Sequence, residues 1–133
     1  MKNRLLLLLF LTAFSCRAQE SKITKVNISY VDFEIETFYT IKCNDFETRF
    51  GKEMKRKTLY DGVLLERLNY FLNKMKPDNE GYIPDVRAKL EIYYNDRKVR
   101  VLCMSELGAQ LDGKSMLLDK GFVNLIKSME SHK

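Results

Sequence analysis

Apolar side chains recur every three or four residues in two stretches of the chain, which is the spacing of one buried helical face. In the first stretch these positions are Leu64, Leu68, Phe71, Leu72 and Met75. In the second they are Phe122, Leu125, Ile126 and Met129. Thr58 or Asp61 is the candidate N-cap of the first helix, which Pro77 ends, and Asp119 is the candidate N-cap of the second.

Alternating apolar and polar positions predict strands elsewhere. The clearest is residues 86–94, which pair as a hairpin with residues 99–103 around a turn at Asn95–Asp96. Residues 22–30 form a first strand, and a change of apolar parity at Val31 predicts a bend over residues 32–37. The pattern then predicts a second strand over residues 38–43.

Three shorter segments connect these elements. Asn44 or Asp45 is placed to cap a short helical turn that contains Phe46 and Phe50. The charged residues 51–57 are expected to be a connection. Asp112–Gly113 is a turn signal between two short apolar pieces and allows one more short strand.

The order is therefore strand, strand, helix, strand, strand, an optional short strand, and helix. We predict an α+β fold, with a single antiparallel sheet of four to five strands and two helices packed on one face. Residues 19–133 are expected to form one compact domain, because a chain of this size buries enough surface for a core of its own.

The amino terminus is typical of an export signal. Residues 1–4 are basic, and an apolar run of about half the length needed to span a bilayer follows from Leu5 to Phe14. We therefore predict that residues 1–18 are a signal peptide or a lipoprotein signal. The alternative is that the segment stays uncleaved as a membrane tether.

Two cleavage sites fit this signal. Cleavage between Ala18 and Gln19 follows small residues at the −3 and −1 positions. The residues Ala13-Phe14-Ser15-Cys16 resemble a degenerate bacterial lipobox, which implies that Cys16 is acylated and attaches the chain to a membrane. Either processing route places the protein in the periplasm or outside the cell.

Net charge does not indicate a nucleic-acid partner. The chain carries +5, but three of its 23 basic residues and none of its 18 acidic residues lie in the first eighteen positions. The remaining surface is therefore nearly balanced, and no pattern of aromatic and basic residues accompanies it. The densest basic stretch, residues 52–57, is expected to be solvated or to touch anionic lipid headgroups.

Cys43 and Cys103 remain as a pair once Cys16 is assigned to the signal. Both end predicted strands and share a face with apolar residues, so both sulfurs are expected to point into the core. Export favours a disulfide between them, which would close a loop of about 60 residues. The alternative is two buried free thiols.

The sequence lacks the histidines and the glycine-rich loop on which many catalytic and phosphate-binding sites depend. His132, the only histidine, lies one residue from the carboxyl end, and the glycines are scattered singly. We therefore expect no cofactor, no metal and no enzymatic activity. Asp32, Glu34 and Glu36 are the only grouped carboxylates, and they fit a weak calcium site, an acid–base pair or, more simply, a solvated face.

The polar face of the strand over residues 86–94 is a candidate surface for a protein partner. It carries Arg87, Lys89, Glu91 and Tyr93, and tyrosine and arginine are enriched at binding hot spots. The same pattern also fits an ordinary solvated sheet face.

Export, one compact core and the absence of a catalytic set lead to one functional hypothesis. We predict an exported, non-enzymatic domain that binds another protein, as an inhibitor, an immunity-type partner or an envelope accessory subunit. The second hypothesis is a carrier of a small ligand or lipid, with a cavity bordered by Phe71, Leu72, Met75, Phe122 and Met129. A carboxylate-based hydrolase is the third.

Overall fold

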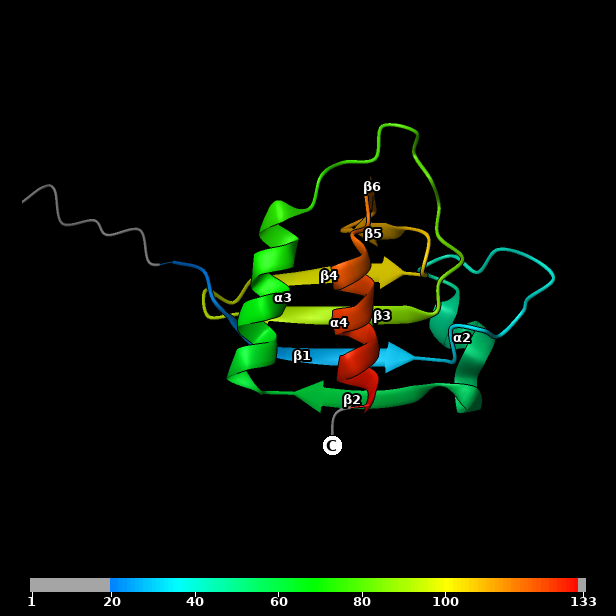
Figure 1. Cartoon of the computed structure of the whole chain (residues 1–133). Helices are drawn as coiled ribbons and strands as arrows, with labels where there is room; N and C mark the ends of the chain where they lie inside the picture. Colours follow the sequence, from blue (N-terminus) through cyan, green and yellow to red (C-terminus); the bar gives the residue numbers. More distant parts are fainter. Residues whose placement is uncertain (1–19, 132–133) are drawn as a thin grey trace, which may run out of the picture.

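The computed structural model describes residues 20–131, which form one six-stranded antiparallel sheet and three α-helices (Figure 1). The strands are β1 (Ile23–Tyr30), β2 (Lys55–Leu59), β3 (Ala88–Tyr94), β4 (Val99–Met104), β5 (Ala109–Leu111) and β6 (Lys114–Met116). The helices are α2 (Phe46–Phe50), α3 (Gly62–Lys74) and α4 (Lys120–Ser131), and a 3-10 turn, η1 (Gly51–Glu53), follows α2. The spatial order of the strands is β2-β1-β3-β4-β5-β6.

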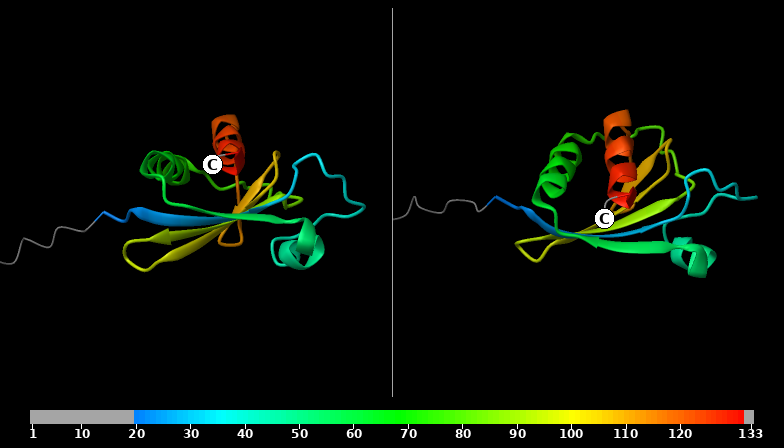
Figure 2. Two further views of the ribbon diagram at one scale, coloured as in Figure 1. Left: turned by 90° about the horizontal axis from the view of Figure 1, so that it is seen from below. Right: turned by 60° about the horizontal axis from the view of Figure 1, so that its bottom comes forward.

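The main core lies between the sheet and two helices, as the sequence predicts. Figure 2 shows α3 and α4 on the same face of the sheet. Asp61 caps α3 by accepting a hydrogen bond from the Leu64 amide, and Asp119 caps α4 by accepting from the Gly121 and Phe122 amides. The largest fully buried side chains of this core are Ile28, Leu68, Leu90, Ile92, Leu102, Met104, Phe122, Leu125, Ile126 and Met129.

The predicted hairpin of β3 and β4 is confirmed, and its register pairs Leu90 with Leu102. The turn at Asp112–Gly113 is confirmed as well. Both residues have positive φ, 51° and 79°, which is the geometry of a two-residue hairpin turn. This turn adds two short strands to the sheet, so the sheet has six strands rather than four to five.

The second strand lies later in the chain than the pattern predicts. Residues 38–43 are irregular, whereas β2 begins within the charged stretch 51–57 expected to be a connection, and it pairs with β1. β2 is an edge strand in which only Leu59 is buried, so it needs no alternating apolar face. Lysine-rich edge strands are common because charge prevents unwanted pairing.

A second, smaller core lies at one end of the sheet, on the face opposite α3 and α4. Figure 2 shows α2 on that side. Its buried members are Val31, Ile41, Phe46, Phe50, Met54, Val86 and Cys103, with Ile35, Cys43 and Val101 packed against them. The change of parity at Val31 is therefore the point at which the chain leaves the main core for the second one.

The predicted signal over residues 1–18, with Cys16, Ala18 and Gln19, lies outside the described residues, as does His132. Within residues 20–131, no helix is long and apolar enough to cross a bilayer.

A candidate binding site where three loops meet

Three loops meet at the end of the sheet that carries α2 (Figure 1). They are residues 31–45 after β1, residues 82–87 before β3, and residues 105–108 between β4 and β5. We call these three segments the loop end. Loops held by a rigid sheet are common positions for binding residues, so the contacts that hold these three determine what the loop end can do.

The Arg87 side chain joins the first two loops. It is only 5% exposed. Its Nη2 lies 2.7 Å from Oδ2 of Asp85, and its Nε and Nη2 donate to the Ile35 carbonyl at 3.0 and 2.7 Å. A third bond from Nη2 reaches Oγ1 of Thr37 at 3.1 Å. One buried guanidinium therefore fixes the backbone of the loop before Phe38.

Asp85 completes this arrangement from the other side. Its Oδ1 accepts a hydrogen bond from the Ile41 amide at 2.7 Å, and its Oδ2 accepts from Thr37 at 3.1 Å. Burial acts to raise the pKa of Asp85, but hydrogen bonds from Arg87 and Ile41 and the charge of Arg87 outweigh it and hold that pKa below its usual value. Asp85 is thus stabilised as a carboxylate, and it fixes the loop after Phe38.

A disulfide between Cys43 and Cys103 ties the first loop to the sheet. The two Cα atoms are 5.6 Å apart, and 60 residues separate the two cysteines in the sequence. Cys103 is fully buried in the second core, on the face of β4 turned away from α3 and α4. The predicted disulfide is therefore confirmed, and it lies in the second core rather than beneath the helices.

The third loop is held by a close contact between Gly108 and the ring of Tyr82. A Cβ atom at position 108 would overlap that ring, so only glycine fits there. Within the same turn, the Ser105 amide donates to the Gly108 carbonyl at 3.0 Å, and Oγ of Ser105 accepts from the Leu107 amide at 3.2 Å. The tight turn leaves Leu107 at its tip, 81% exposed.

These constraints present apolar side chains to solvent. Of ten large exposed apolar side chains among the described residues, five lie on the loop end. They are Phe38, Tyr39, Tyr82, Ile83 and Leu107. Phe38 is fully exposed, and the guanidinium of Arg49 lies 5.1 Å from the ring of Tyr39. Fixed loops with exposed aromatic and aliphatic tips are typical of protein-binding surfaces.

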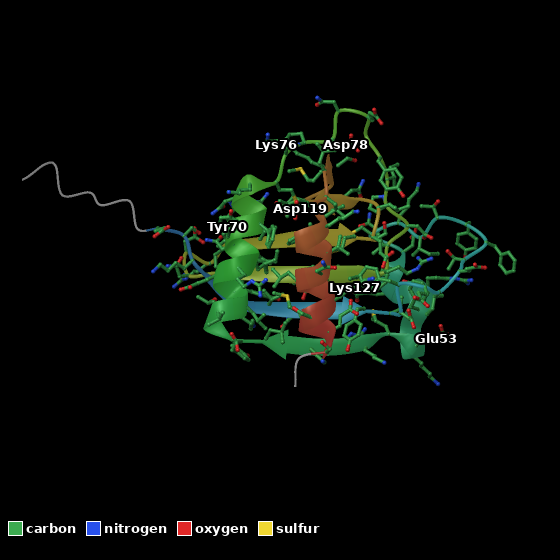
Figure 3. The ribbon with its side chains drawn as sticks, in the orientation of Figure 1. Glu53, Tyr70, Lys76, Asp78, Asp119 and Lys127 are labelled. Atoms are coloured by element: carbon green, nitrogen blue, oxygen red, sulfur yellow. A yellow bond between two sulfur atoms is a disulfide. The ribbon has the colours of Figure 1, made fainter. Side chains whose placement is uncertain are left out.

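The loop end is also acidic. Asp32, Glu34 and Glu36 are exposed on the loop that carries Phe38. Glu106 lies on the third loop, where its carboxylate pairs with Lys127 of α4, a residue labelled in Figure 3. A surface that complements this end would therefore combine an apolar hollow with basic side chains around it.

The polar face predicted on β3 is present, but Arg87 is not part of its exposed surface. Arg87 points away from α3 and α4 as predicted, yet the loop over residues 31–45 covers it. Lys89 pairs with Glu47 at 2.7 Å, and Glu91 lies 3.4 Å from both Asn27 Nδ2 and the Tyr93 hydroxyl. These side chains are half-buried and pair with neighbouring polar groups of the sheet and of α2.

The grouped carboxylates Asp32, Glu34 and Glu36 are exposed on a loop rather than aligned on a strand. The Glu34 amide donates to Oδ1 of Asp32 at 2.9 Å, so this carboxylate stabilises a local turn. Across residues 20–131, no group of three or more histidine, cysteine, aspartate or glutamate side chains is placed to hold a metal ion.

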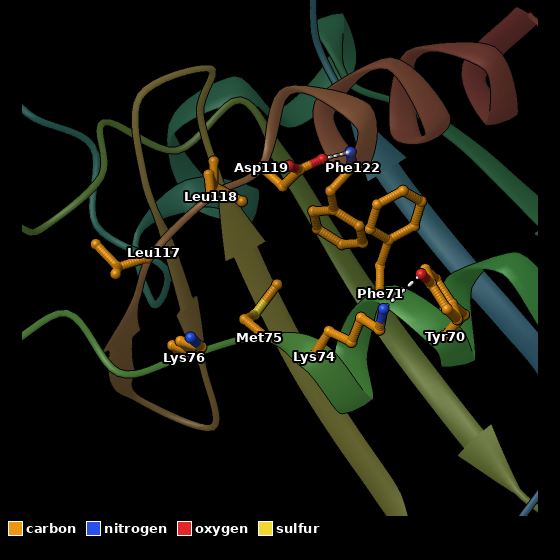
Figure 4. A pocket seen from close by; sticks show the side chains of 9 residues that line it. All are labelled: Tyr70, Phe71, Lys74, Met75, Lys76, Leu117, Leu118, Asp119 and Phe122. Carbon is orange, nitrogen blue, oxygen red and sulfur yellow. Dashed lines mark hydrogen bonds between the residues drawn. The ribbon is translucent and has the colours of Figure 1, made fainter.

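The residues predicted to border a cavity separate into two groups. Leu72 and Met129 are buried in the main core. Phe71, Met75 and Phe122 line a hollow of about 390 Å³ at the ends of α3 and α4, which Figure 4 shows from close by, and Phe122 is also buried in the main core. This hollow lies beside the helix ends rather than between the sheet and the helices.

No protein-family model, curated protein or solved structure matches this chain. The geometry of the loop end is therefore the main guide to its function.

Sequence reasoning missed the loop end. Tyr39, Ile41 and Cys43 alternate with Thr40 and Lys42 as in a strand, so the pattern predicts half-buried side chains over residues 38–43. Two features of the sequence together argue against this strand: the bend at Val31 and the pairing of Cys43 with Cys103. If Cys43 reaches Cys103, the segment that ends at Cys43 cannot also pair with β1 as a strand.

Proposed function

We propose that this chain is an exported, non-enzymatic module that binds another protein, and that the loop end is its contact surface. The observation that carries this proposal is the set of five exposed apolar side chains on three loops that are held in place. The disulfide, the Asp85–Arg87 pair and the Tyr82–Gly108 contact order these loops before any partner binds. Such pre-ordering lowers the entropic cost of association.

The charge of the loop end specifies the kind of partner. Three exposed carboxylates, Asp32, Glu34 and Glu36, precede Phe38 and Tyr39 on the same loop. We expect a partner protein with an apolar hollow for Phe38 and lysine or arginine side chains near its rim. Complementary charge of this kind raises the association rate and excludes wrong partners.

Export agrees with the confirmed disulfide, because paired cysteines persist in oxidising compartments. Attachment through an acylated Cys16 also agrees with the position of the loop end. The described chain enters the sheet at Ile23, and Tyr30, where β1 reaches the loop end, is about 25 Å further along the strand. A membrane anchor at the amino terminus would leave the loop end pointing away from the membrane.

Affinity capture from an envelope extract tests the proposal. The bait is the protein itself, compared with a Phe38→Ser/Leu107→Ser variant and with a Tyr60→Ser/Val63→Ser control. Tyr60 and Val63 are each 69% exposed and lie at the opposite end of the sheet, so the control removes comparable apolar surface.

We expect one partner that the first variant captures at least about tenfold less well and that the control captures normally. Equal capture by both variants would contradict the assignment of the loop end. A partner lost only with the control would place the contact surface at the other end.

A further inference from the structure

A hollow beside the ends of two helices is a second candidate site, separate from the loop end. Its wall is formed by the last turn of α3, the residues after it, and the segment that leads into α4 (Figure 4). The volume of about 390 Å³ lies within the range of small-molecule sites, which is about 300–1,000 Å³.

The floor and sides of the hollow are apolar. They are formed by Phe71, Met75, Leu117, Leu118 and Phe122. The rings of Phe71 and Phe122 lie 5.7 Å apart and form part of the lining. Leu117 remains 54% exposed, and Phe71, Met75 and Leu118 are only partly buried. The main core therefore leaves apolar surface here that no other described segment covers.

Basic side chains outnumber acidic ones around the hollow. Lys74 and Lys76 belong to its lining, and the Lys74 ammonium donates to the Tyr70 hydroxyl at 2.6 Å. Asp119 is the one acidic residue in the lining, and its Oδ1 accepts from the Gly121 amide at 2.7 Å and the Phe122 amide at 3.3 Å. Because the helix backbone neutralises part of this negative charge, the two lysines dominate.

We infer that this hollow binds a small carboxylate with an aliphatic body. The aliphatic part lies against Phe71, Met75 and Phe122, and the carboxylate lies at the rim near Lys74 and Lys76. A singly charged carboxylate fits the lining, because two ammonium groups, Lys74 and Lys76, face one carboxylate, Asp119, and leave a single positive charge to be matched.

Titration of the purified protein with octanoate, followed by amide chemical shifts, tests this inference. We expect shifts confined to residues 70–76 and 117–122. Hexanoate is expected to bind more weakly, with each methylene group changing Kd by up to about fourfold. Octylamine, which has the same aliphatic chain and the opposite charge, is expected not to bind.

Matched variants separate the contribution of the apolar lining to octanoate binding from the contribution of the lysine charges. Leu117→Trp fills the mouth of the hollow and is expected to abolish binding. Val99→Trp places the same side chain at the start of β4, outside both the hollow and the loop end, and is expected to leave octanoate binding unchanged. Leu117 and Val99 are both exposed, so both variants keep the fold. Lys76→Gln is expected to weaken binding about two- to fivefold, and Lys52→Gln, at a distant exposed position, to have no effect.

Three results would overturn the inference. The first is the absence of shifts at millimolar octanoate, and the second is shifts that lie outside the hollow. The third is octylamine binding as well as octanoate, which would exclude a carboxylate site. None of these results bears on the loop end, because its test uses a protein partner and different residues.

Discussion

The two hydrophobic cores of this protein are built in different ways. The main core buries twenty residues of regular strands and helices, most of which the periodic pattern of the chain predicts. The second core buries seven residues, and four of them, Val31, Ile41, Met54 and Val86, lie in irregular segments. A disulfide and the ion pair between the buried Arg87 and the partly exposed Asp85 accompany the second core, and this disulfide does not involve the main core.

This difference indicates that a small core of irregular segments requires specific long-range bonds. Regular elements satisfy their backbone polar groups internally, so apolar burial alone is enough to assemble them. The loop over residues 31–45 has no such ladder. Arg87 and Asp85 supply hydrogen-bond partners to part of its backbone, and the disulfide adds a covalent link to the sheet. The loop end can therefore hold exposed tips in fixed positions.

The largest expected effect separates the two cores directly. Phe122→Ala in the main core is expected to lower the free energy of unfolding by about 3–5 kcal/mol. Phe46→Ala is expected to cost less and to speed hydrogen exchange mainly in residues 41–54, because the second core can open locally. Urea unfolding measures the loss of free energy in each variant, and hydrogen exchange shows which residues open. Equal losses, with exchange raised throughout, would show that the two cores unfold together.

Removal of the disulfide tests how the second core is held. A Cys43→Ala/Cys103→Ala variant is expected to lose about 4 kcal/mol of unfolding free energy, the value for a closed loop of this length. Reduction of the unaltered protein with dithiothreitol serves as an independent comparison. If urea midpoints stay the same in both cases, the disulfide does not stabilise the second core.

Arg87 and Lys89 lie two positions apart on the same face of the sheet but differ in burial. Arg87→Leu is expected to cost about 3 kcal/mol, because it leaves Asp85 and the Ile35 carbonyl without their main partner. Lys89→Leu is expected to cost less than about 1 kcal/mol, because its pair with Glu47 is partly exposed. Thermal unfolding compares them, and similar shifts would contradict the role of Arg87.

A rise in pH should change the contributions of Glu130, in α4, and of Asp85, at the loop end, to the free energy of unfolding in opposite directions. Burial of Glu130, at the end of α4, raises its pKa from 4.5 to about 7; Asp32 also raises it, while Lys127, Lys57 and Lys55 oppose the shift. The folded state then binds more protons, so this contribution is present below pH 4.5 and is lost as the pH rises through about 7. The lowered pKa of Asp85 has the opposite sign, and its contribution is lost as the pH falls below its usual value of 3.8.

Measurements of unfolding free energy against pH check both contributions. Glu130→Gln is expected to remove the decline between pH 4.5 and 7, and Asp85→Asn to reduce the acid-side loss. A decline near neutral pH that survives in Glu130→Gln would assign it to another group.

The smallest expected effect concerns the tips of the loop end. Phe38→Ser is expected to change the free energy of unfolding by less than about 0.5 kcal/mol, because the side chain is fully exposed. Differential scanning calorimetry measures this change. A loss above 1 kcal/mol would mean that Phe38 packs within the protein, and it would weaken the proposal that this side chain serves a partner.

The main core was predictable because its signals are local. The stripe that contains Leu68 and Leu72, with Leu64 partly buried beside them, and the caps at Asp61 and Asp119 each act within a few residues. The position of Lys89, Glu91 and Tyr93 on the polar face of β3 was also predictable, because alternation along a strand is a local signal. The position of β2 was not, because an edge strand with one buried residue has no apolar period to detect.

The chain alone therefore determined the α+β class, the two helices and the central hairpin, since period and capping depend on near neighbours. The sequence also contains the pair of cysteines. Whether Cys43 reaches Cys103, 60 residues later in the chain, depended on the path of the loop over residues 31–45 across the sheet. Only the tertiary structure decided that Arg87 is buried and that Phe38, Tyr82 and Leu107 share one end. These relations join segments far apart in the sequence, and no local pattern records such contacts.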